Sequence, residues 1–112
     1  MATPEKKVKD RVKKILEEID AYYFLPATGY GGRKGVPDIV GCYQGKFFGI
    51  ECKAGKNKPT KLQVYELNKI KKAGGKAIIF TDATKPKELK NILDDLESDD
   101  EYWNHWALQN IS

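Results

Sequence analysis

The sequence predicts an α/β fold in which a mixed sheet of about four strands is flanked by helices, in the order α-β-β-β-α-β-α. Segments with helical spacing of apolar residues alternate with short β-rich runs, and residues 36–53 place two such runs around Gln44-Gly45, as in a hairpin. A chain of 112 residues is long enough for one domain and too short for two. We expect this domain to span residues 1–97 and an acidic, aromatic tail to span residues 98–112.

The predicted helices and strands follow from local signals. A first helix begins at Thr3-Pro4, with Thr as N-cap and Pro in the first helical position, and runs to about Asp20 with one apolar face. A short strand over residues 21–25 is stopped by Pro26. The elements expected after the hairpin are a helix from about residue 59 to 73, a buried strand over residues 76–81, and a helix from about residue 85 to 96 whose apolar side is Leu89, Ile92, Leu93 and Leu96.

The hairpin brings three charged residues together. Pairing centred between Gln44 and Gly45 places Asp38 opposite Glu51, and Lys53 points to the same face, diagonal to Asp38. Directly opposed carboxylates repel one another, so the sheet gains no stability from this pair. A divalent ion such as Mg²⁺ would explain the pair, since it takes oxygen ligands and is commonly held by one or two carboxylates. The alternative is a salt-bridge cluster on a solvated face.

Composition limits the class of protein. Cys42 and Cys52 lie on opposite faces of the predicted hairpin, so they are poor disulfide partners, and a reducing cytoplasm fits. No apolar run approaches the roughly 20 residues that span a bilayer, so we expect neither a membrane protein nor a secreted one.

The charge distribution suggests a polyanion as partner. Residues 1–93 carry 20 basic against 10 acidic side chains, a balance of +10, although a lysine-rich solvated surface would have the same composition. We expect residues 28–35 to form a glycine-rich basic loop just before Asp38. This loop lacks the Lys-Ser/Thr ending and the strand-loop-helix context of a nucleotide-binding P-loop, so no nucleotide cofactor is expected. The loop either contacts a phosphate backbone or is a plain connection. The predicted DNA-binding residues are Tyr30, Arg33, Lys34, Lys56, Lys58 and Lys61.

Two polar residues on the predicted helices each have two interpretations. Glu5 lies on the apolar face of the first helix, where it could reach the acidic patch or interact with the helix dipole. Gln63 completes a capping box with Thr60, but it also projects from a helix face shared by Leu62 and Tyr65 that we expect to face the sheet. Both alternatives stay open for each residue.

Three motifs carry a family resemblance over residues 5–81. The runs at residues 35–41 (GVPDIVG), 48–53 (FGIECK) and 58–63 (KPTKLQ) resemble the PD-(D/E)XK nuclease superfamily, which implies a restriction-endonuclease-like core. Within it the chain looks like the small stand-alone VRR-NUC proteins of bacteria and phages, and is also similar to archaeal Holliday-junction resolvases.

The resemblance implies a role for each matched residue. Asp38, Glu51 and the backbone carbonyl of Cys52 would bind Mg²⁺ or Mn²⁺, and Lys53 would orient the attacking water and stabilise charge on the phosphate. Glu5 would correspond to the acid on the superfamily's first helix, which binds metal or holds water. Gln63 would correspond to the glutamine on its second helix.

The function expected from this resemblance is a metal-dependent DNA endonuclease that hydrolyses phosphodiester bonds in branched DNA such as Holliday junctions. We expect it to work as a homodimer in the cytoplasm of a bacterial or phage-infected cell. The alternatives are a flap or restriction-type nuclease acting on other DNA forms, and a non-catalytic nucleic-acid-binding module.

Overall fold

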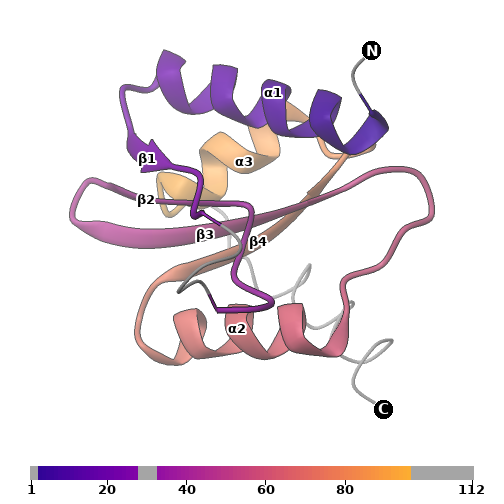
Figure 1. Cartoon of the computed structure of the whole chain (residues 1–112). Helices are drawn as coiled ribbons and strands as arrows, with labels where there is room; N and C mark the ends of the chain where they lie inside the picture. The colour runs from indigo at the N-terminus through magenta and orange to yellow at the C-terminus, as the bar shows by residue number, and fades with distance from the viewer. Residues whose placement is uncertain (1–2, 28–32, 97–112) are drawn as a thin grey trace.

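The computed structural model describes residues 3–27 and 33–96, which contain three helices and four strands in the predicted order (Figure 1). These elements are α1 (Pro4–Glu18), β1 (Tyr22–Phe24), β2 (Ile39–Tyr43), β3 (Lys46–Lys53), α2 (Lys61–Lys72), β4 (Lys76–Thr81) and α3 (Pro86–Leu93). The α/β fold class is therefore confirmed. Tyr30 and the tail over residues 98–112 lie outside the described residues.

The four strands form one mixed sheet in the order β1-β2-β3-β4. The first three strands are antiparallel neighbours, whereas β4 pairs in parallel with β3 and is reached through α2. A parallel neighbour requires such a crossover, because the chain must return to the same end of the sheet. As a result α1 and α3 cover one face of the sheet and α2 covers the other (Figure 1).

The predicted register of the hairpin is confirmed. Val40 pairs with Gly49, and Tyr43 pairs with Lys46. Gln44 and Gly45 both have positive φ values, 50° and 83°, as tight two-residue hairpin turns require. The last pair within the strands joins Ile39 to Ile50, so the next residues along, Asp38 and Glu51, lie side by side.

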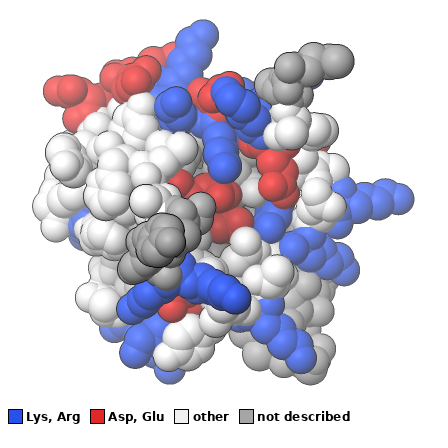
Figure 2. All heavy atoms as spheres, in the orientation of Figure 1, with Lys and Arg blue, Asp and Glu red and all other residues white. Residues whose placement is uncertain are grey.

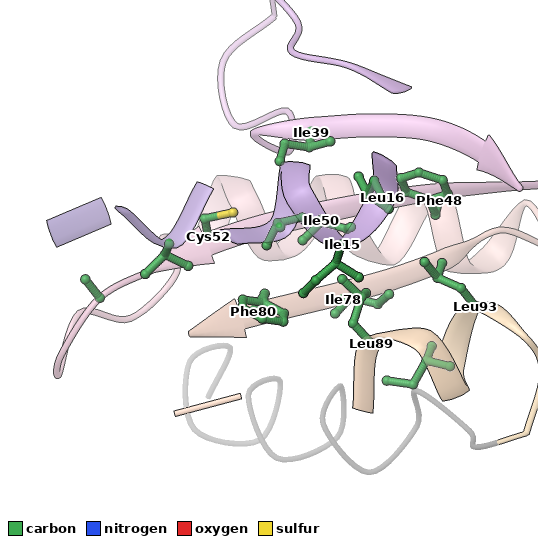
Figure 3. Close-up of a cluster of buried hydrophobic side chains, with 14 residues drawn as sticks. Ile15, Leu16, Ile39, Phe48, Ile50, Cys52, Ile78, Phe80, Leu89 and Leu93 are labelled. Atoms are coloured by element: carbon green, nitrogen blue, oxygen red, sulfur yellow. The ribbon is translucent and has the colours of Figure 1, made fainter. Parts of the chain in front are cut away.

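The main core lies between the sheet and the two helices α1 and α3 (Figure 3). Leu16 of α1 and Leu89 of α3 pack with Phe48 and Phe80 of the sheet, and all four side chains are fully buried. Each such side chain contributes about 1.5–3 kcal/mol by leaving water. A second, smaller cluster lies under α2 and consists of Val64, Leu67, Ala77 and Ile79. Because β4 is covered on both faces, it has the unbroken apolar run that the sequence shows.

The structure corrects the predicted face of the second helix. Val64 and Leu67 are buried, whereas Leu62 and Tyr65 are 46% and 54% exposed. The rotation of α2 is set by its packing on Ala77 and Ile79 of β4, which turns the face with Leu62 and Tyr65 away from the sheet.

The end of the third helix also differs from the prediction. α3 ends at Leu93, and Leu96 is 73% exposed instead of joining the apolar side. Asp95 has a positive φ of 61° and forms ion pairs with Lys46 at the start of β3 and Lys76 at the start of β4, which hold the chain against this end of the sheet. Hydrogen bonds from these two lysines lower the pKa of Asp95 to about 2.

Candidate active site

Asp38 lies at the entrance to β2 and is held in place by the neighbouring strand. Its Oδ2 accepts a hydrogen bond from the backbone N–H of Cys52 at 2.9 Å. Its Oδ1 lies 3.7 Å from the ammonium of Lys9, which reaches over from α1. The side chain remains 24% exposed, so the carboxylate is both anchored and accessible from solvent.

Glu51 and Lys53 lie near the end of β3, on the face of the sheet that carries α2. Glu51 is 2% exposed, and its Oε2 lies 3.5 Å from the Lys53 ammonium, which is itself nearly buried. The other carboxylate oxygen, Oε1, is buried and has no hydrogen-bond partner among the described residues. The structure thus brings Asp38, Glu51 and Lys53 together as the hairpin register predicts.

The pKa of Glu51 shows how unfavourable its charge is in this position. Burial, followed by the nearby Asp38 carboxylate, raises the pKa from 4.5 to about 8, although Lys53 acts in the opposite direction. A buried carboxylate beside another acid, with one oxygen unpaired, is costly without a cation. This favours the cation-site interpretation over a simple solvated salt-bridge cluster.

Cys52 contributes its backbone to this site and its side chain to the core. The thiol is fully buried in the main cluster, and burial raises its pKa, so it is not a reactive thiolate. Cys42 is exposed, and both cysteines are free, as the parity of the hairpin predicts.

Glu5 lies in the first turn of α1, half-buried, in a shallow depression of about 320 Å³ that it shares with Lys9 and Lys13. Within residues 3–27 and 33–96, no three His, Cys, Asp or Glu side chains gather in a way that could hold a metal ion. Glu5, Asp38 and Glu51 therefore do not form a three-carboxylate metal cluster in this part of the chain, and the role of Glu5 as a ligand or water-holder stays a prediction. From α1 the residue that approaches Asp38 is Lys9, one turn later. This contact could not be predicted from the sequence, because one lysine in a lysine-rich helix gives no distinctive signal.

Gln63 forms the capping box that its spacing predicts. Its Oε1 accepts the backbone N–H of Thr60 at 2.9 Å, and the Thr60 hydroxyl accepts the backbone N–H of Gln63 at 3.2 Å. The capping interpretation is confirmed, and it occupies the carbonyl oxygen of this side chain.

Acidic side chains gather at the middle of one molecular face, between α1 and α2, with lysines and arginines above and below them (Figure 2). The predicted DNA-binding residues Lys34, Lys56, Lys58 and Lys61 are all exposed. Arg33 is different, because its guanidinium is ion-paired with Glu66 of α2, a buried acid.

A mixed sheet with an aspartate entering one hairpin strand and Glu-x-Lys on the other is typical of restriction-endonuclease-like nucleases. The comparison with known families agrees. The model of the archaeal Holliday junction resolvase (Hjc) family, which lies in the restriction-endonuclease-like superfamily, matches residues 10–104, and the chain belongs to this family. The match supports the resolvase resemblance, whereas the likeness to VRR-NUC proteins stays a prediction. No curated protein matches the sequence. Within the described residues, no helix is both long and apolar enough to cross a membrane.

Proposed function

We propose that this protein is a divalent-metal-dependent endonuclease that hydrolyses phosphodiester bonds in branched DNA, with Holliday junctions as its substrate. Membership of the Hjc family supports a nuclease. The observation that carries the proposal is the position of Glu51, a buried carboxylate with an unpaired oxygen beside Asp38 and Lys53. A purely structural site has no need for this arrangement.

The residues fit a hard divalent cation. The unpaired Oε1 of Glu51 and the accessible carboxylate of Asp38 are oxygen donors of the kind that Mg²⁺ and Mn²⁺ prefer, and the Cys52 carbonyl belongs to the same strand segment. These three groups would hold the ion. When bound, it would supply a nucleophilic water at neutral pH and compensate negative charge on the phosphate. The accessory roles of Glu5 and Gln63 rest on the family resemblance alone.

The protein's own residues contribute to the reaction in two ways. The backbone N–H of Cys52 and the Lys9 ammonium fix the orientation of Asp38. The Lys53 ammonium lies in a nearly buried position, where a positive charge interacts more strongly with the transition state than it would in water. Lys53 would therefore orient the attacking water and stabilise the charge that develops on the non-bridging oxygens.

DNA would be held by its phosphates. The exposed residues Lys34, Lys56, Lys58 and Lys61 precede Asp38 or follow Lys53 in the chain, so they are available to position a phosphate backbone near the site. Tyr30, four positions before Lys34 in the sequence, would take part as well.

A homodimer would suit the proposed substrate, because resolution of a four-way junction requires two symmetric cuts. An apolar surface for such a contact exists on the sheet. Tyr22, Cys42 and Phe47 form one cross-strand row, and all three are exposed, with Phe24 in the adjacent row 52% exposed. The two free cysteines fit a reducing compartment.

The test is cleavage of a labelled four-way junction beside linear duplex, flap and single-stranded DNA, with Mg²⁺, Mn²⁺ or EDTA, using wild type and Asp38→Ala. Symmetric, metal-dependent cutting of the junction alone, lost in the variant, is the expected result. Metal-dependent cutting of flap or linear DNA would replace the resolvase with a flap or restriction-type nuclease. Binding without any cutting would indicate a non-catalytic nucleic-acid-binding module.

A further inference from the structure

The segment that leads into Asp38 is attached to α2 by a buried charge. Glu66 is 7% exposed, and its carboxylate forms an ion pair with the guanidinium of Arg33, whose side chain is 72% exposed. Arg33 begins the segment over residues 33–37, here called the strap, which ends directly before Asp38. An ionised carboxylate in a buried position needs its partner, so the pair holds the start of the strap against α2.

Two close backbone contacts fix the rest of the strap. Gly35 has a φ of +84° and packs so tightly on the first turn of α2 that an added Cβ would lie 2.7 Å from Leu62 Cγ and 2.9 Å from its backbone carbonyl. Pro37 is buried against Gly49 of β3. A Cβ added to Gly49 would lie only 2.9 Å from Cγ of Pro37. The strap is therefore held at its beginning and middle by α2 and at its end by the sheet.

We propose that Glu66 is a positioning residue, which acts through Arg33 and the strap to place the Asp38 carboxylate beside Glu51. This inference rests on the proposed function, since it concerns the same metal-binding pair. It assigns Arg33 a role inside the protein in place of the phosphate contact predicted from sequence. Because the geometry of a catalytic group matters at the scale of about 1 Å, release of the strap should lower the rate by about tenfold to a hundredfold.

The experiment compares Glu66→Gln and the charge exchange R33E/E66R with both single changes of that exchange. The matched control is Glu18→Gln, which removes the exposed Glu18–Lys90 pair between α1 and α3, far along the chain from the strap. Mn²⁺ affinity is measured by calorimetry without DNA, and the single-turnover rate and junction affinity are measured at one salt concentration. Thermal unfolding verifies that each variant is folded.

We expect Glu66→Gln to weaken Mn²⁺ binding and slow the reaction by about tenfold or more, while junction affinity stays within about twofold. The charge exchange R33E/E66R should recover the Mn²⁺ affinity and the rate that its two single changes lose. If Arg33 instead serves DNA, Glu66→Gln will leave Mn²⁺ affinity unchanged and the exchange will not recover junction affinity, which overturns the proposal. Gly35→Ala provides a second variant should arginine at position 66 prevent folding. It displaces the strap with the ion pair intact, and it should reproduce the loss of Mn²⁺ affinity.

A readout independent of catalysis separates this inference from the proposed function. Trypsin cleaves after Arg33 and Lys34, and an anchored strap resists it, so Glu66→Gln should accelerate cleavage at these two bonds by about tenfold. Equal trypsin rates in wild type and variant would overturn the anchoring role, whether or not the protein cuts DNA. Failure of the wild type to cut any DNA would refute the proposed function and leave the trypsin result to decide the anchoring.

Discussion

Replacing Glu51 by glutamine should stabilise the metal-free protein at alkaline pH while it removes activity. In the metal-free fold burial and Asp38 raise the pKa of Glu51 from 4.5 to about 8. Between these two pH values the folded protein binds one proton that the unfolded chain has already released. The contribution of Glu51 to the stability of the fold is therefore fully present below its pKa in the unfolded chain, 4.5, and is lost as pH rises through its pKa in the folded protein, about 8.

The size of the effect follows from the same two pKa values. At about 1.4 kcal/mol per pH unit, the full window from 4.5 to about 8 corresponds to roughly 5 kcal/mol of unfolding free energy. A glutamine has the same shape, carries no charge and can direct its amide toward Asp38, so it avoids this loss. The variant should match wild type near pH 5 and exceed it by a few kcal/mol near pH 8, which for a domain of this size raises Tm by about 10 °C or more.

The assay is urea or thermal unfolding in EDTA across about pH 5 to 8.5, with Glu18→Gln as an exposed-carboxylate control. Addition of Mg²⁺ should stabilise wild type, by about 2.7 kcal/mol at a hundredfold excess over Kd, and should leave Glu51→Gln little changed. Parallel pH profiles for wild type and variant would refute the argument that Glu51 is held against its charge.

Four further predictions follow from the site and its surroundings. Lys53→Ala should slow single-turnover cleavage by about a hundredfold or more while DNA affinity is largely kept, because Lys53 acts in the transition state; equal losses of rate and affinity would contradict this role. Asp38→Asn should weaken divalent-metal binding by about tenfold or more, and an unchanged calorimetric titration would argue against the metal site. Gln63→Ala should cost about 1 kcal/mol of stability through loss of the capping box, with a smaller effect on cleavage; a hundredfold loss of rate in a folded variant would show a catalytic role instead. Junction affinity should fall steeply as salt is raised, whereas a flat dependence would remove the electrostatic argument for phosphate binding.

The elements that could be predicted from the sequence are those set by neighbours in the chain. Thr3 and Thr60 cap their helices through bonds to backbone N–H groups three residues later, so the helix starts are encoded locally. The Gln44-Gly45 turn fixes the hairpin register, and the register places Asp38 beside Glu51. A two-residue turn and the alternation of side chains on a strand require no knowledge of the rest of the fold.

Contacts between residues distant in the chain could not be predicted in this way. The buried face of α2 depends on its packing against β4, and the end of α3 depends on the ion pairs of Asp95 with Lys46 and Lys76. The sequence likewise gives no sign that Glu66 holds Arg33, 33 positions earlier, or that Lys9 reaches Asp38.

The sequence by itself determined which residues form the acidic pair and which strands carry them, because short-range geometry is enough to align a hairpin. Only the tertiary structure decided how the pair behaves. The burial of Glu51 under neighbouring elements, with one oxygen unpaired, raises its pKa to about 8 and makes a cation favourable there. Burial is a property of the assembled core, and it arises when segments far apart in the chain exclude water from the same place.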